Sequence, residues 1–200
     1  MIVAAVNPQA VPATLGVLGD PRILSRPLVG LLCSAQLPPS AALAVSDLAR
    51  ALRDAGVAVV SGFQSAGERE CLTFLLRGRQ PVVICPARGL GGMRLPAAWL
   101  AAVGEGRLAL VSALPDRVRR PTAAIAEARN RLVVTLSDAL VVLHATPNGR
   151  LAKLAAESLR AGRRVYCLDL PENGDLRVAG AVACGTAELA GLAAKVGGAP

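Results

Sequence analysis

Polar and glycine residues follow several short apolar runs in this sequence, and these positions are where its chemistry is expected. They include Ser34, the segment Ser61-Gly62-Phe63-Gln64, Arg88, and residues 144–149. If the apolar runs are parallel strands, their carboxyl ends meet at one edge of a sheet, which is where open α/β proteins bind ligands. We therefore predict a ligand-binding edge that includes Ser34, Ser61, Gly62, Gln64 and Arg88.

Asn148 and Gly149 precede a predicted helix, and Lys153 follows one turn later. Free backbone N–H groups at a helix start can hold a phosphate, and a lysine nearby would add charge. The alternative is an ordinary N-cap turn. Neither G-K-[ST] nor G-x-G-x-x-G is present, so the sequence has no nucleotide-cofactor fingerprint and we expect no cofactor.

A second candidate phosphate contact is Arg129-Asn130-Arg131, which is polar within an otherwise apolar helical stretch. Two guanidinium groups beside an amide could hold a phosphate, because guanidinium matches its oxygens in a bidentate way. The alternative is a solvated helix face. Residues 117–120 (Arg-Val-Arg-Arg) add positive charge just upstream, on a predicted loop.

The sequence gives no positive argument for catalysis. His144 is the only histidine, and neither Glu127 nor Glu157 forms a convincing carboxylate pair. The five cysteines lack metal-ligand spacing, so we expect no metal site and interpret them as buried thiols of a reducing cytoplasm. We therefore predict a cytoplasmic binding protein and not an enzyme.

The charge balance favours a polyanionic partner. The formal net charge is +8, and all but two of the 22 basic residues are arginines. The alternative is that an Ala-, Arg- and Pro-rich composition reflects a GC-rich genome. Aromatic residues make up only 2% of the chain, whereas proteins that stack single-stranded bases usually expose several rings.

The apolar pattern predicts alternating strands and helices. Continuous β-branched runs predict buried parallel strands at residues 28–33, 57–60, 82–85, 108–111, 139–143 and 164–168. Helical periodicity predicts helices over 39–55, ending at Gly56, and over 151–161, ending at Gly162. This alternation is typical of a single α/β domain with a Rossmann-like, doubly wound, mostly parallel sheet.

We expect residues 1–27 to form a lead-in with turns and residues 28–200 to form the domain, including a C-terminal turn and a helix near 187–195. The chain is long enough for one sizeable core. Its sequence has no signal-peptide pattern and no apolar run long enough to span a membrane, so no membrane association is expected.

From about residue 18 to 192, these segments resemble the Rossmann-like core of the DNA-processing protein A (DprA, or Smf) family. Residues 129–139, RNRLVVTLSDA, are similar to that family's R-N-R-I-I-x-x-L-S stretch. Val59-Val60-Ser61-Gly62 resembles the opening of its second loop. Residues 159–166, residues 173–181 and the lead-in Leu18-Gly19-Asp20-Pro21 resemble further family elements.

The resemblance implies single-stranded DNA binding, a role in loading the RecA recombinase during DNA uptake, and association as a homodimer. It also implies that the basic strand-end loops form the DNA surface. A separate winged-helix domain, frequent in that family, has no room in residues 28–200, so none is expected.

The strand-end loops depart from the family pattern. Ala35 stands where the family's first loop has an arginine, and Ser65 stands where its second loop has one. Two alternatives therefore stay open. One is a nucleotide-binding or phosphoribohydrolase domain of the related Lonely Guy type, whose catalytic glutamate would correspond to Glu157. The other is a structural paralogue that has lost its ligand.

Overall fold

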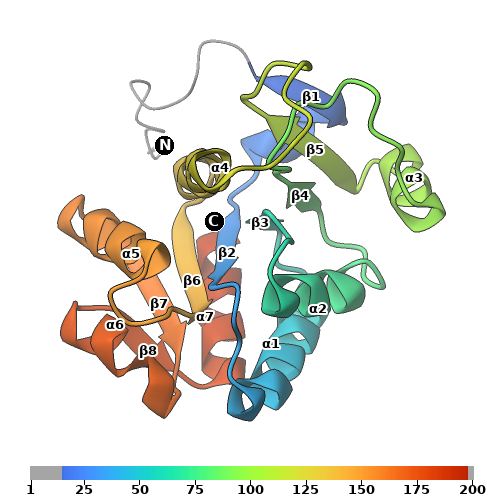
Figure 1. Ribbon diagram of the computed structural model, residues 1–200. Helices are drawn as coiled ribbons and strands as arrows, with labels where there is room; N and C mark the ends of the chain where they lie inside the picture. The colour runs from blue at the N-terminus through green and yellow to red at the C-terminus, as the bar shows by residue number, and fades with distance from the viewer. Residues whose placement is uncertain (1–14, 198–200) are drawn as a thin grey trace.

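The computed structural model describes residues 15–197, and its centre is one twisted sheet (Figure 1). Within this range the sheet has eight strands in the order β1-β5-β4-β3-β2-β6-β7-β8. The strands are β1 (Gly16–Gly19), β2 (Val29–Cys33), β3 (Val59–Ser61), β4 (Val82–Ile84), β5 (Leu108–Ser112), β6 (Ala139–His144), β7 (Arg164–Leu168) and β8 (Val182–Cys184). All strand pairs are parallel except the pair β1 and β5.

Helices cover both faces of the sheet. The α-helices are α1 (Ala42–Asp54), α2 (Ala66–Leu75), α3 (Ala97–Gly104), α4 (Ala123–Leu136), α5 (Arg150–Arg160), α6 (Gly174–Val178) and α7 (Thr186–Gly197). Short 3₁₀ turns are η1 (Pro21–Ser25), η2 (Pro39–Ala41) and η3 (Pro171–Asn173). Buried side chains of α1, α2, α3 and α7 form one core with the sheet, and those of α4, α5 and α6 form a second core on the opposite face.

This architecture confirms the predicted Rossmann-like α/β fold. The six predicted strands match β2 to β7 to within about two residues. Strands buried on both faces carry apolar residues at successive positions, which makes them recognisable in the sequence. The two predicted helix stops are also confirmed. Gly56 and Gly162 follow the ends of α1 and α5 with φ of +70° and +77°, which glycine adopts without strain.

The N-terminal side of the domain differs from the prediction. Residues 16–25, expected to be turns of a lead-in, form β1 and η1, and β1 pairs antiparallel with β5 at the edge of the sheet. Only Val17 and Leu18 lie between the two glycines of β1, which is too short an apolar run to indicate a strand. The sequence reasoning also did not predict α2, whose N-terminus is described below.

None of the helices in residues 15–197 is long and apolar enough to cross a membrane.

Candidate functional site

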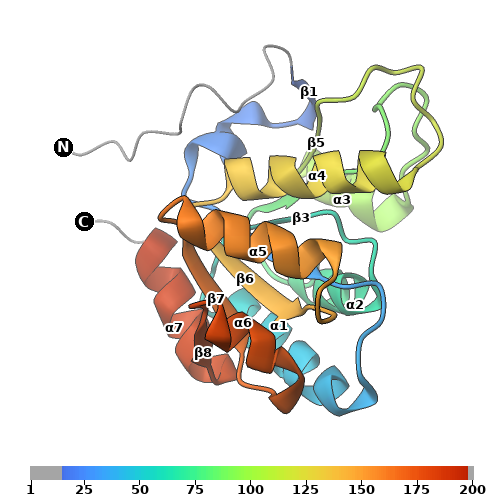
Figure 2. The ribbon, with the colours of Figure 1, turned by 60° about the vertical axis from the view of Figure 1, so that its left-hand side comes forward.

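A cleft of about 590 Å³ opens at the carboxyl ends of β2, β3 and β6. The strand order reverses at β2, whose neighbours are β3 on one side and β6 on the other, and this is where doubly wound sheets bind ligands. The neighbouring helices α4 and α5 form one wall (Figure 2). The lining residues are Cys33, Ser34, Ala35, Gln36, Gln64, Ser65, Glu68, Ala126, Arg129, Asn130, Thr146, Gly149, Arg150 and Leu151.

A smaller cavity, of about 400 Å³, lies beside Arg26 and Gly56 at the opposite edge of the sheet. The parallel strands begin there, and this fold class does not place its ligands at that edge. The cleft at the carboxyl ends is therefore the candidate site.

Arg129 is the most deeply placed cation of the cleft, with only 7% of its surface exposed. Its Nη2 donates a long hydrogen bond of 3.4 Å to Gln64 Oε1, while Nε and Nη1 have no partner among the described residues. Burial lowers the pKa of Arg129, and the nearby Glu68 partly opposes that shift. This guanidinium therefore has donors available and only one weak acceptor.

Gly62 makes room for that guanidinium. A Cβ atom built on Gly62 would lie 1.1 Å from Arg129 Nη1, so no side chain fits beside Arg129 in this position. Gly62, which the sequence indicated together with Ser61, therefore contributes to the site by leaving space for the Arg129 side chain. Ser61 is fully buried, and its hydroxyl accepts a hydrogen bond of 3.3 Å from Phe63 N.

Glu68 connects β2 to the loop between β3 and α2. Its buried carboxylate accepts hydrogen bonds from the backbone N–H groups of Cys33 (3.0 Å) and Gln64 (2.9 Å). Together with Ser65, whose hydroxyl accepts from Glu68 N at 3.2 Å, it forms the capping box that begins α2. The sequence reasoning missed both residues, although Ser65-x-x-Glu68 is a capping-box pattern.

The loop that precedes α5 completes the cleft. Ser34 donates its backbone N–H to His144 O, and its hydroxyl accepts from Thr146 N; both distances are 2.9 Å. Gly149 is the N-cap of α5 and supplies no side-chain cap, which leaves the first N–H groups of the helix free of a capping side chain. Arg150 lines the cleft at this point. It was not selected from the sequence, although it directly follows the Asn148-Gly149 pair.

Arg129, Asn130 and Arg131 have different surroundings. Asn130 lines the cleft, and its buried Oδ1 has no partner among the described residues. Arg131 lies outside the lining, where it forms ion pairs with Glu157 (2.8 Å) and Glu127 (3.3 Å). These contacts raise the pKa of Arg131 and lower that of Glu157. The charge of Arg131 is thus neutralised by two carboxylates at the protein surface.

Three other residues selected from the sequence also lie outside the lining. Asn148 and Lys153 are exposed on the loop and on the first turn of α5. Asn148 has a φ of +56°, as its place in the turn requires. Arg88 follows β4, and its Nε donates to Gly89 O at 3.3 Å. Of the eleven selected residues, the cleft lining includes Ser34, Gln64, Arg129, Asn130 and Gly149.

The cysteines and the single histidine are buried. All five cysteines are buried and free, and burial, reinforced by Glu68, raises the pKa of Cys33 to about 12. His144 is buried, and its Nδ1 has no partner among the described residues. Within residues 15–197, no group of three or more His, Cys, Asp or Glu side chains is arranged to hold a metal ion.

Comparisons with known proteins agree with this architecture. Structures of DNA processing protein A from Streptococcus pneumoniae (TM-score 0.74, 17% identity) and Helicobacter pylori (TM-score 0.73, 20% identity) share the fold. The matches cover 88% and 92% of this chain, and 65% and 88% of those chains. The molybdenum cofactor carrier protein of Chlamydomonas reinhardtii matches at a TM-score of 0.58 and 17% identity, over 86% of this chain and 98% of that one.

A search of the curated proteins found no match. The S. pneumoniae protein is longer than the matched region, since this chain spans 65% of its length. A family model described as DNA recombination-mediator protein A matches residues 4–192, a description that names a mediator and not a catalyst. This match confirms the resemblance seen in the sequence and covers almost the whole chain. The chain is therefore a member of the DNA recombination-mediator protein A family.

Proposed function

We propose that this protein binds single-stranded DNA, with a backbone phosphate seated in the cleft at the carboxyl ends of β2, β3 and β6. Arg129 and Arg150 would contact the phosphate oxygens, and the first N–H groups of α5 would donate to the same group. The H. pylori relative is described by its single-stranded DNA binding mode. RecA loading, a homodimeric assembly and a cytoplasmic location belong to this proposal as predictions from the family resemblance.

The observation that carries the proposal is the state of Arg129. The guanidinium of an arginine with only 7% of its surface exposed normally has hydrogen-bond partners, because an unpartnered buried donor costs free energy. Here two of its three nitrogens have none among the described residues. A phosphate supplies several acceptor oxygens in the geometry that a guanidinium matches. An anion beside Arg129 would offset the cost of burying this positive charge.

The same surroundings favour recognition of the DNA backbone over recognition of bases. Phe63 is 6% exposed, and no aromatic residue is among the residues that line the cleft. The guanidinium groups of Arg50 and Arg77 lie 4.7 and 5.4 Å from the centroid of the partly buried Phe74 ring, outside the cleft lining. Without a stacking ring in the cleft, binding should depend on phosphate charge and vary little with base sequence.

Fluorescence anisotropy with labelled oligo-dT tests this function. We expect Arg129→Gln to weaken binding about tenfold or more, as for the loss of a charge-assisted contact. Arg164→Gln is the matched control, because Arg164 is exposed at the amino end of β7, at the opposite edge of the sheet. No binding by the wild-type protein at low salt, where phosphate contacts are strongest, would refute the proposal.

The phosphoribohydrolase alternative loses its candidate base in this structure. Glu157, which would have to face a nucleotide, forms an ion pair with Arg131 outside the cleft lining. A ligand-free structural paralogue is also less favoured. Such a protein would not require the space that Gly62 leaves for the buried Arg129 guanidinium. Release of free base from nucleoside monophosphates would restore the enzymatic alternative.

A further inference from the structure

Three arginines on the loop between β5 and α4 do not line the cleft. Arg117, Arg119 and Arg120 are exposed, and none forms an ion pair with a described residue. Six other arginines form ion pairs with carboxylates, namely Arg22, Arg50, Arg53, Arg107, Arg131 and Arg177. We refer to Arg117, Arg119 and Arg120 together as the loop arginines.

The acidic residue of this loop compensates only part of their charge. Asp116 is the only carboxylate between residues 113 and 122, and its Oδ1 accepts a hydrogen bond of 2.7 Å from Gly91 N. This bond connects the β5–α4 loop to the loop that follows β4. The three arginines outnumber this one carboxylate, so the loop presents a net positive charge to solvent.

The two loops hold each other in place. Gly89 N donates to Val118 O at 2.9 Å, and the Ser112 hydroxyl donates to Arg88 O at 2.8 Å. The chains approach so closely that a Cβ on Gly89 would lie 2.4 Å from Pro115 O. The loop arginines thus extend from a braced backbone, which reduces the entropy lost when they bind a partner.

The loop arginines lie at the same edge of the sheet as the cleft. β5, β4, β3 and β2 are parallel neighbours, so their carboxyl ends share one edge, and β5 is three strand spacings, roughly 14 Å, from β2. The loop leads directly into α4 (Figure 2). From Ala123, where α4 begins, to Arg129 is a rise of roughly 9 Å along the helix.

We propose that the loop arginines form a second contact for the same DNA strand, beyond the phosphate seated in the cleft. This inference rests on the proposed function. A single strand that extends by roughly 3.4 Å or more per nucleotide covers the roughly 14 Å between the ends of β2 and β5 in about four nucleotides. An acidic protein segment would also match the charge. The shared sheet edge and the short distance to Arg129 favour the continuing DNA strand.

The test compares oligonucleotides of two lengths. The triple variant Arg117→Gln/Arg119→Gln/Arg120→Gln should bind dT16 about tenfold more weakly than the wild type and show a salt-dependence slope smaller by roughly two. Its binding to dT2, measured by competition, should be unchanged, because dT2 is too short to reach from the cleft to the loop arginines. The matched control is Arg26→Gln/Arg160→Gln/Arg164→Gln, which removes the same charge from exposed positions at the amino-end edge of the strands.

The outcomes separate this inference from the proposed function. If Arg129→Gln has no effect on either oligonucleotide, the cleft proposal fails and the second contact fails with it. If Arg129→Gln weakens both while the triple variant binds dT16 like the wild type, only the second contact is overturned. Loss of poly-glutamate binding by the triple variant, with dT16 binding intact, would overturn it in favour of an acidic protein partner. Circular dichroism verifies that each variant is folded.

Discussion

Gly62 and Arg129 act as one unit at the residue scale. The absence of a Cβ at Gly62 lets the Arg129 guanidinium lie against the backbone of the β3–α2 loop, where Gln64 Oε1 is its single hydrogen-bond acceptor among the described residues. Gly62 does not have a positive φ, so its backbone conformation accepts other residues. The glycine is required here for space.

A single methyl group at this position therefore tests the site. We expect Gly62→Ala to displace the guanidinium from its place and to weaken oligo-dT binding about as much as Arg129→Gln. The variant should still fold, because the clash involves the end of a flexible side chain. Anisotropy titrations and far-ultraviolet circular dichroism measure the two effects.

Gly104→Ala is the matched control, since a Cβ at Gly104 meets nothing within 4 Å and its φ is not positive. It should leave DNA affinity unchanged. Wild-type affinity in Gly62→Ala would contradict the assignment of Arg129 to the phosphate contact.

At the scale of elements, α2 begins at the capping box and also organises the cleft. The Ser65 hydroxyl caps the helix locally, whereas the Glu68 carboxylate additionally accepts from Cys33 N in the neighbouring β2 strand. The bond from Cys33 N to Glu68 is buried and the bond from Gln64 N is part-buried, so removal of Glu68 leaves at least the Cys33 N–H without an acceptor away from water. The two residues of the capping box thus differ in their contacts: Ser65 stabilises the helix start alone, whereas Glu68 also stabilises its connection to β2.

We expect this difference to appear in stability. Ser65→Ala should lower the free energy of unfolding by about 1 kcal/mol, as for the loss of an N-cap side chain. Glu68→Ala should cost more, about 3 kcal/mol or above, because it leaves buried N–H groups without acceptors. Urea denaturation monitored by circular dichroism measures both. Equal losses for the two variants would show that the bonds from Glu68 to the loops contribute nothing to stability.

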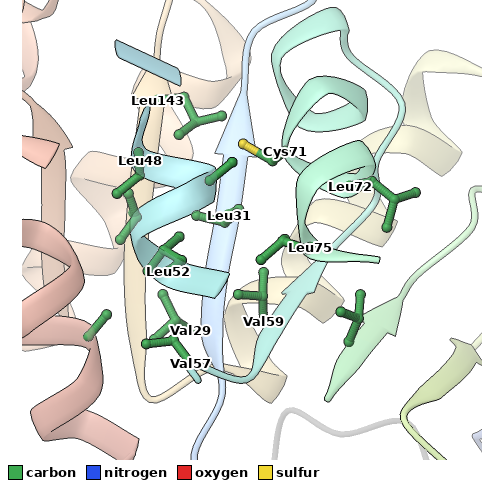
Figure 3. Close-up of a cluster of buried hydrophobic side chains, with 14 of the residues drawn as sticks. Val29, Leu31, Leu48, Leu52, Val57, Val59, Cys71, Leu72, Leu75 and Leu143 are labelled. Carbon is green, nitrogen blue, oxygen red and sulfur yellow. The ribbon is translucent and has the colours of Figure 1, made fainter. Parts of the chain in front are cut away.

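At the scale of the whole molecule, the sheet is buried between two helical layers with no shared side chains. Figure 3 shows the core on the α1 and α2 face, where Leu31 of β2 lies among Leu48 and Leu52 of α1 and Leu75 of α2. The next side chain along the strand, Leu32, belongs to the core on the α4 and α5 face. The central strand that ends at the cleft is therefore fixed from both sides.

Truncation of Leu31 should accordingly be costly. Leu31 is fully buried, and Leu31→Ala is expected to lower the free energy of unfolding by about 2–5 kcal/mol through the lost contacts and the cavity left behind. Leu43→Ala on α1 is the control, because Leu43 is 70% exposed, and it should change stability by less than about 0.5 kcal/mol. Thermal or urea unfolding distinguishes them, and equal effects would contradict this description of the core.

Much of the architecture could be predicted from local patterns. Residues 28–33 and 139–143 are apolar throughout because both faces of these strands are covered, and Gly56 and Gly162 end helices because glycine adopts a positive φ freely. The short strands β1 and β8 have weaker patterns, since they lie at the edges of the sheet. Their pairing depends on neighbours that are distant in the sequence.

The sequence by itself determined that polar residues after the apolar strands meet at one edge of a parallel sheet, and it singled out the Arg129-Asn130-Arg131 triplet. Only the tertiary structure decided which arginine faces the cleft. Arg129 and Arg131 are two residues apart on α4 and therefore about 200° apart around the helix. One lies against Gly62 and the other against Glu157 of α5. That choice depends on how α4 packs on the sheet and beside α5, a contact between segments that no local pattern encodes.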